Sequence, residues 1–147
     1  MSSFVPLRLV FAAVLVSPLL GSGSVLANPD LVGCYSDLGP RGAVRAIVAA
    51  SESRYTITHP RTRDAKPNPL APASAKDLDT VKRGLQALGV VADPAQGLMH
   101  DDGFDVEVVV IFAEPAVHPW RTGFGQTRYA ISTRDETYLV YRVPCPR

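Results

Sequence analysis

The run FDVEVVVIF at residues 104–112 constrains the fold most, because no other stretch combines as much β-propensity with as much apolar character. In a strand, successive side chains alternate between the two faces of a sheet. One face of this run would be apolar throughout, whereas the other begins with Asp105 and Glu107 and becomes apolar at Val109 and Ile111. A strand of this kind is half-buried at first and then buried on both faces. We therefore expect it at the centre of a sheet.

The first 27 residues have the pattern of a signal peptide. Arg8 and the amino terminus supply positive charge, a short apolar run follows at Leu9–Leu20, and small residues lead to Ala27. The apolar run has 12 residues, whereas a membrane span needs about 20. We expect cleavage after Ala27, export to the periplasm or the medium, and no transmembrane segment.

A lipid anchor is the alternative location. Leu31-Val32-Gly33-Cys34 resembles a lipobox, in which the cysteine would be lipidated and become the new amino terminus. A lipobox normally adjoins the apolar run, whereas here a Gly/Ser stretch, Pro29 and Asp30 intervene. The soluble exported form is the stronger expectation.

Residues 28–147 have the length of one domain. Once Arg8 is removed with the leader, the remaining basic and acidic residues are equal in number. Nucleic-acid binders have a strong basic excess, so this class of partner is excluded.

Two cysteines, Cys34 and Cys145, lie near the two ends of the mature chain. In an exported protein an even pair predicts a disulfide. A metal site would require more Cys or His ligands beside them, and none is present in the adjacent sequence. The disulfide would bring the first and last strands together.

The rest of the chain predicts further strands joined by turns and loops. Alternation and turn residues place them at residues 31–36, 43–50, 54–59, 126–133 and 137–143. Residues 60–73 are expected to form a long basic loop because of their four prolines, and residues 90–103 to be rich in turns.

One amphipathic helix is predicted between these segments. Ser74 and Asp77 have the spacing of a capping box, and Gly89 has the place of a helix terminator. The apolar stripe consists of Leu78, Val81, Leu85 and Leu88. We expect this stripe to cover the Val109 and Ile111 face of the central strand, with Gly84 allowing close approach.

These elements predict an α+β fold, with a mostly antiparallel curved sheet of about six strands and one helix. The alternative is a small β-barrel with the helix closing one end.

The loop at residues 115–125 is the first candidate binding surface. It contains Trp120, the only tryptophan, flanked by His118 and Arg121. Tryptophan and arginine in loops are frequent binding anchors. The alternative is that the indole of Trp120 plugs the end of the core, since such a large ring is usually buried. The basic loop adds Arg61 and Arg63 to the candidate binding residues.

Catalytic and metal-binding chemistry has weaker support. His100 precedes Asp101 and Asp102, and a histidine beside a carboxylate could act in acid–base chemistry or bind a metal. A solvated turn before the strand explains the cluster better, and His59 and His118 are distant in sequence. No metal motif, phosphate-cradling loop or dinucleotide fingerprint is present, so no metal and no cofactor are expected.

Three functions follow from these features. The first is a small exported binding protein without catalysis, an inhibitor or immunity-like partner of another protein; the expected architecture resembles that of small exported lysozyme inhibitors and immunity-type proteins. The second is a carrier of a small apolar ligand in a cavity lined by Val108, Val110, Phe112, Ile131 and Leu139. The third is a small hydrolase that uses His100 with Asp101 or Asp102.

Overall fold

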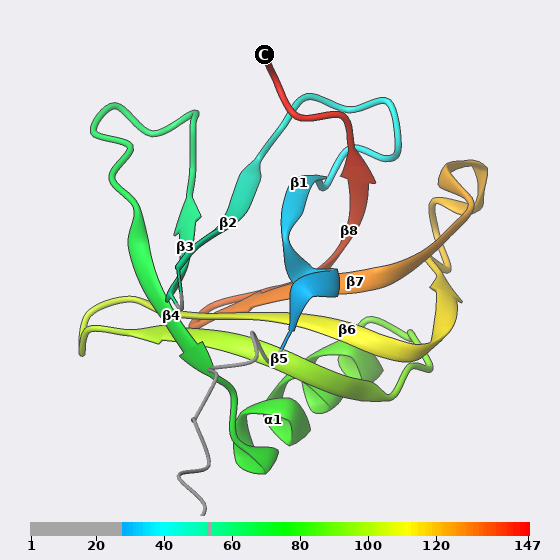
Figure 1. Cartoon of the computed structure of the whole chain (residues 1–147). Coiled ribbons are helices and arrows are strands. Elements are labelled where there is room, and N and C mark those ends of the chain that lie inside the picture. The colour runs from blue at the N-terminus through cyan, green and yellow to red at the C-terminus, as the bar shows by residue number, and fades with distance from the viewer. Residues whose placement is uncertain (1–27, 53) are drawn as a thin grey trace, which may run out of the picture.

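The computed structural model describes residues 28–147 except Ser53, so the predicted leader lies outside the described residues. Eight strands form a closed antiparallel barrel in which each strand pairs with the next and β8 pairs with β1 (Figure 1). The strands are β1 (Gly33–Ser36), β2 (Ala46–Ser51), β3 (Arg54–Thr58), β4 (Asn68–Pro72), β5 (Pro94–Asp101), β6 (Val106–Val117), β7 (Gln126–Thr133) and β8 (Thr137–Val143). The helices are α1 (Ala75–Ala87) and the short 3₁₀ turns η1 (Pro29–Leu31) and η2 (Thr122–Phe124).

The antiparallel sheet and its single α-helix are confirmed, and of the two predicted architectures the small barrel fits, with eight strands rather than about six. The two missed strands are β4 and β5, in the segments predicted to be a loop and turns. Strand β4 was not predicted because it contains prolines, which are unfavourable within strands, and it pairs with β5 at only two positions. Strand β5 was not predicted because its residues have modest β-propensity. It forms because it pairs with β6 at seven positions.

Strand β6 is the expected central strand, but it extends five residues beyond Phe112. Pro115 does not end it. The register with β7 shifts between Ile111 and Ala116, so Pro115 lies in a bulge, where a missing N–H is tolerated. At the other end, Phe104 was assigned to the core face and is instead 85% exposed in the β5–β6 turn.

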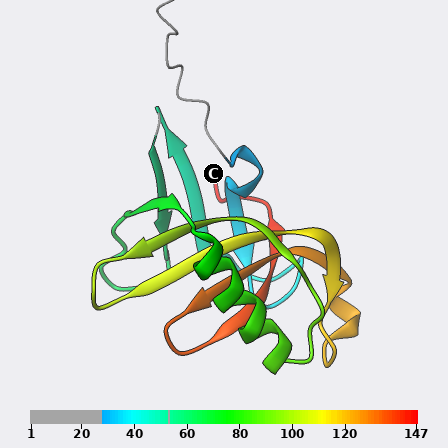
Figure 2. The same ribbon diagram turned by 90° about the horizontal axis from the view of Figure 1, so that it is seen from below.

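The two faces of β6 bury against different partners. The lumen of the barrel holds one apolar cluster, which includes Tyr35, Ile57, Leu98, Val109, Ile111, Ile131 and Val140. A second cluster lies between the outside of the sheet and α1, and includes Val81, Leu85, Val108, Val110, Phe112 and Leu139. Figure 2 shows α1 lying across the strands that bear this second cluster.

Two predictions about these faces are therefore wrong. The helix covers Val108 and Val110, not Val109 and Ile111, and it lies on the side of the barrel rather than at one end. The five residues predicted to line one apolar cavity are also divided, with Ile131 in the lumen and the other four beneath α1. The alternation of a strand makes a common cavity impossible for these five side chains.

Helix α1 begins and ends as predicted. The Ser74 hydroxyl accepts from the Asp77 amide while the Asp77 carboxylate accepts from the Ser74 amide, and Gly89 follows the helix with φ of 75°. Gly84 lies directly against Thr137 of β8, leaving no room for a Cβ atom. This close approach places the helix on the sheet.

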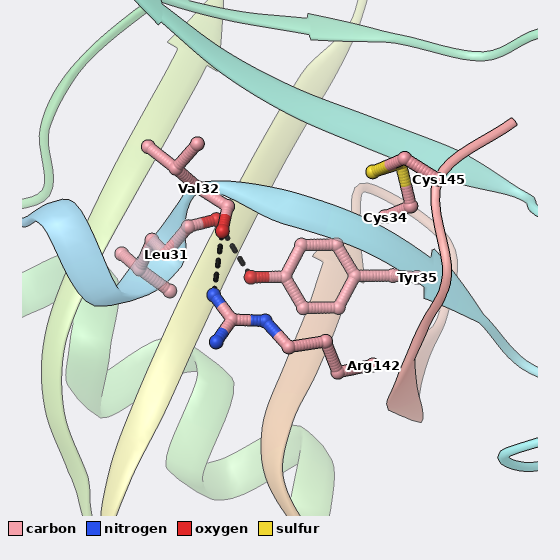
Figure 3. Close-up of a disulfide and its surroundings, with 6 residues drawn as sticks. All are labelled: Leu31, Val32, Cys34, Tyr35, Arg142 and Cys145. Atoms are coloured by element: carbon pink, nitrogen blue, oxygen red, sulfur yellow. Dashed lines mark hydrogen bonds between the residues drawn. A yellow bond between two sulfur atoms is a disulfide. The ribbon is translucent and has the colours of Figure 1, made fainter. Parts of the chain in front are cut away.

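The disulfide between Cys34 and Cys145 is confirmed, with a Cα–Cα distance of 5.2 Å (Figure 3). It reinforces the pairing of β1 with β8, in which Cys34 lies opposite Val143. Close by, the Tyr35 hydroxyl donates to the Leu31 carbonyl and the Arg142 guanidinium donates to the Val32 carbonyl, which fastens η1 to the barrel. Because the sulfur of Cys34 is in the disulfide, it is not available for lipidation. A disulfide is typical of an exported protein in a non-reducing environment.

Replacing Cys34 and Cys145 together by serine should lower the free energy of unfolding by about 4–5 kcal/mol, because the bond closes most of the described chain into one loop. Urea denaturation with and without reductant measures the change. The double variant should be insensitive to reductant, and a loss of less than about 1 kcal/mol would show that β1–β8 pairing needs no covalent support.

Gly84→Ala should destabilise the protein by about 1–3 kcal/mol, because the new methyl group collides with Thr137. In a solvent-facing helix position the same change would stabilise the helix by about 0.5–1 kcal/mol. Gln86→Ala, on the exposed side of α1, is the matched control and should be nearly neutral. Thermal unfolding of the three proteins decides the sign, and a more stable Gly84→Ala protein would contradict the close packing.

Candidate functional site

A cleft of about 340 Å³ opens at one mouth of the barrel. We call it the barrel-mouth cleft; its polar lining includes Arg45, His59, His100, Glu107, Thr133 and Tyr138. Two of these positions follow from strand alternation: Glu107 is two residues before Val109, and His100 is two residues after Leu98, so both face the lumen. The apolar lumen therefore ends in a polar layer.

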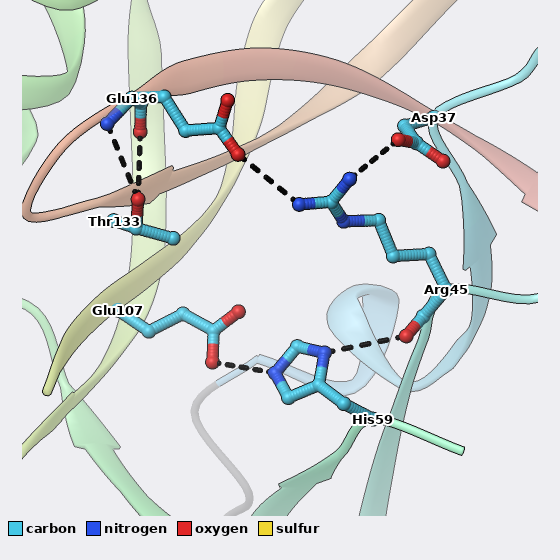
Figure 4. Close-up of polar contacts among 6 residues, drawn as sticks. All are labelled: Asp37, Arg45, His59, Glu107, Thr133 and Glu136. Atoms are coloured by element: carbon cyan, nitrogen blue, oxygen red, sulfur yellow. Dashed lines mark hydrogen bonds and ion pairs between the residues drawn. The ribbon is translucent and has the colours of Figure 1, made fainter. Parts of the chain in front are cut away.

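A hydrogen bond between His59 and Glu107 crosses this layer (Figure 4). His59 Nε2 lies 2.9 Å from Glu107 Oε2, although the two residues come from opposite sides of the lumen, just after β3 and within β6. His59 Nδ1 lies 3.2 Å from the carbonyl oxygen of Arg45. A carbonyl only accepts, so Nδ1 carries a hydrogen, and a second proton is held between Nε2 and the carboxylate. The hydrogen bond to Glu107 raises the pKa of His59 above its usual 6.5.

The side chain of Arg45 forms one wall of the barrel-mouth cleft. Its guanidinium donates to Asp37 at 2.6 Å and to Glu136 at 3.1 Å, and it stacks 4.3 Å from the ring centre of Tyr138. These contacts join the β1–β2 loop to the β7–β8 turn. Burial raises the pKa of Tyr138 to about 12, so its phenol stays neutral at physiological pH.

Two buried acceptors in the barrel-mouth cleft have no hydrogen-bond partner among the described residues. They are Oε1 of Glu107 and Nε2 of His100, whose residues are each 7% exposed. The two residues lie directly opposite each other on β5 and β6, so their side chains are neighbours on the lumen face. A buried polar group without a partner costs about 1–3 kcal/mol. The presence of two such atoms side by side is the strongest indication of a binding site in the barrel.

The predicted cluster around His100 is partly a turn and partly a site. Asp101 Oδ1 accepts from the Gly103 amide, and Asp102 Oδ1 accepts from the amides of Phe104 and Asp105, so both carboxylates shape the β5–β6 turn. Those amide bonds lower the pKa of Asp102. Its second oxygen, Oδ2, lies 3.5 Å from His100 Nε2. His100 Nδ1, 3.0 Å from the Pro69 carbonyl, must donate to it.

The loop that carries Trp120 lies beside a second cleft, of about 590 Å³. We call it the outer cleft; it lies between α1, the β7–β8 hairpin and the loop, and its lining includes Gly84, Leu88, His118, Arg121 and Glu136. Trp120 is 84% exposed, so the prediction that its indole plugs the core is wrong.

Short contacts hold the Trp120 loop in place. The Trp120 amide donates to His118 Nδ1 at 3.1 Å, and the Arg121 guanidinium donates to the Asp37 carbonyl at 3.4 Å. Partial burial and the charge of Arg121 lower the pKa of His118, which favours the neutral ring that the amide bond requires. His118 is thus a positioning residue for the loop.

The five predicted binding residues do not form one surface. His118, Trp120 and Arg121 lie together, whereas the loop that carries Arg61 and Arg63, between β3 and β4, is on the opposite side of the molecule from η2 in both views (Figures 1 and 2). Both arginines are exposed and line neither cleft.

Glu107 and Arg45 were not predicted as site residues, and nothing in the sequence predicted that His59 and His100 line one cleft. Glu107 was predicted only as part of the charged beginning of a strand face, whereas it is buried and bonds His59. The spacing between Glu107 and Val109 could have predicted this position, because a charged residue two positions before a buried apolar residue in a strand lies on the same face.

Comparisons with protein-family models, with curated proteins and with solved structures found no match to this chain. Within the described part of the chain, no three His, Cys, Asp or Glu side chains are grouped to hold a metal ion. The helices described are all too short or too polar to cross a bilayer.

Replacing Glu107 by Gln should lower the pKa of His59, since the bond to the carboxylate is what raises it. NMR titration of the ring signals measures this directly. In the wild-type protein His59 should titrate above 6.5 and His118 below 6.5. His59 should move in the variant, whereas His118, in the loop at the outer cleft, should not and is the internal control.

The same pair should make stability depend on pH. Because the pKa of His59 is higher in the folded protein than in the unfolded chain, the pair stabilises the fold fully below the unfolded value of 6.5. This contribution is lost as the pH rises through the folded pKa. Glu107→Gln should therefore be more destabilising in urea at pH 5.5 than at pH 9, and equal losses would contradict the pairing.

Proposed function

We propose that this chain is an exported, non-catalytic binding protein that recognises another protein through the Trp120 loop. The observation that carries the proposal is the 84% exposure of Trp120 beside the outer cleft. Tryptophan is highly buried on average, and exposed tryptophan and arginine side chains are frequent anchors in interfaces. An inhibitor or immunity-like role fits a loop that presents such an anchor.

Two hydrogen bonds hold the Trp120 loop in place, which supports binding of a partner without rearrangement of the loop. His118 holds the Trp120 backbone, and Arg121 ties the loop to the β1–β2 loop. A preorganised anchor loses little conformational entropy on binding. The outer cleft beside it provides both charged and apolar side chains for the rim of an interface, including Arg121, Glu136 and Leu88.

The arrangement of His59 supports a structural role rather than a catalytic one for this side chain. Both ring nitrogens are engaged, one by the Arg45 carbonyl and the other by Glu107. A general base needs a free nitrogen within reach of the substrate proton. His59 therefore acts as a structural tie across the lumen.

Site-specific photo-crosslinking tests the proposed interface. A benzophenone amino acid at position 120 should give one major covalent adduct in the exported fraction of the source organism. The same substitution at Val91, an apolar residue that is 95% exposed and lines neither cleft, is the matched control and should give none. Equal labelling from both positions would contradict a specific interface at Trp120.

Replacing Trp120 by Ala should abolish most binding to the partner so identified while leaving the melting temperature nearly unchanged. An exposed side chain contributes little to the fold, whereas an interface anchor contributes about 2 kcal/mol or more to binding. Val91→Ala, at an exposed residue that lines neither cleft, should change neither property. Unfolding of the Trp120→Ala protein would show that the indole supports the loop rather than a partner.

A further inference from the structure

We propose that the barrel-mouth cleft binds a protonated primary amine, with the ammonium group held between Glu107, His100 and Asp102. This site is separate from the Trp120 loop and does not depend on the proposed protein partner. The two clefts share Arg45, Tyr138 and the β7–β8 turn as a common wall.

The first argument is the excess of acceptors. Glu107 Oε1 and His100 Nε2 are buried, face the lumen from opposing positions, and have no hydrogen-bond partner among the described residues. Because His100 Nδ1 donates to the Pro69 carbonyl, Nε2 of the neutral ring offers only a lone pair. Asp102 does not line the cleft itself, but its Oδ2 lies 3.5 Å from His100 Nε2 and adds a third acceptor beside it.

The second argument is the match to an ammonium group. An ammonium has three donors and no acceptor, whereas a hydroxyl has a single donor. Two of the three acceptors are carboxylate oxygens, and charge-assisted hydrogen bonds are about twice as strong as neutral ones. No described group of three His, Cys, Asp or Glu side chains is close enough to coordinate a metal ion directly, whereas an ammonium donates to its acceptors over the longer distance of about 2.7–3.2 Å.

The third argument is that the acceptors are held in place before a ligand arrives. His59 bonds one oxygen of Glu107 and so fixes the carboxylate, whose other oxygen, Oε1, is buried without a partner among the described residues. The Phe104 and Asp105 amides bond Asp102 Oδ1, while Oδ2 lies 3.5 Å from His100 Nε2. A cleft of about 340 Å³ is of the size of small-molecule sites.

The probe is n-butylammonium, and 1-butanol, which has the same chain with a hydroxyl in place of the ammonium, is its neutral control. Titration of the wild-type protein followed by NMR should show saturable shifts of the His100 ring and of the amides around Glu107 with the amine alone. No response, or the same response to both probes, would show that these acceptors do not recognise an ammonium group, and would overturn the proposal.

Three variants locate the charge that matters. Glu107→Gln and Asp102→Asn should each weaken binding of n-butylammonium, by about tenfold for the buried carboxylate and less for the exposed one. Asp101→Asn removes the same charge from the neighbouring residue, whose side chain faces away from the lumen, and should have no effect. If Glu107→Gln does not fold, the comparison of Asp102→Asn with Asp101→Asn decides. Equal weakening by these two would indicate diffuse attraction and overturn the site.

The source of the amine is distinguished by a second pair of probes. The blocked tripeptide acetyl-Gly-Lys-Gly-amide presents the same ammonium on a protein side chain, and its Nε-acetylated form is the control. Tighter binding of the unmodified peptide than of n-butylammonium would support a lysine of a partner as the ligand. Exclusion of the peptide with retained binding of the free amine would support a small molecule, and failure of both would overturn the proposal.

Discussion

Closure of the sheet is the constraint on which the rest of the structure depends. Pairing of β1 with β8, reinforced by the Cys34–Cys145 disulfide, turns a meander of eight strands into a barrel without exposed edges. Closure gives every strand an inner and an outer face. Along β6 the inner face fills the lumen and the outer face packs on α1, so this strand is apolar on both sides. Burial on both faces therefore explains why the run at residues 104–112 is so apolar and lies at the centre of the sheet.

The polar layer at the barrel mouth is a consequence of the same closure. An apolar lumen must meet water somewhere, and here the transition is made by the His59–Glu107 bond across the lumen and by Arg45 at its wall. The layer satisfies one oxygen of Glu107 but leaves the other, together with His100 Nε2, without a described partner. Buried polar groups of this kind carry a cost in stability. Their retention at an open mouth is the reason to regard this layer as a binding site as well as a structural seal.

The molecule thus presents two surfaces of different chemistry on either side of the β7–β8 turn. The Trp120 loop offers an exposed aromatic anchor, which suits a protein partner, whereas the barrel-mouth cleft offers buried acceptors, which suit a small cationic group. Arg45 lines both clefts and bonds Glu136 in the shared turn.

The amino-acid sequence by itself determined the features that depend on near neighbours. These are the α1 capping box at Ser74, the β7–β8 hairpin and the alternation along β6, as well as a pair of cysteines suited to export. Only the tertiary structure decided which face of β6 became the lumen, and with it the burial of Glu107. It also formed β4 and β5, whose own residues favour strands weakly, by pairing them with their neighbours. The His59–Glu107 bond joins residues 48 apart in sequence, and such a contact depends on strand order, register and closure together, none of which local periodicity encodes.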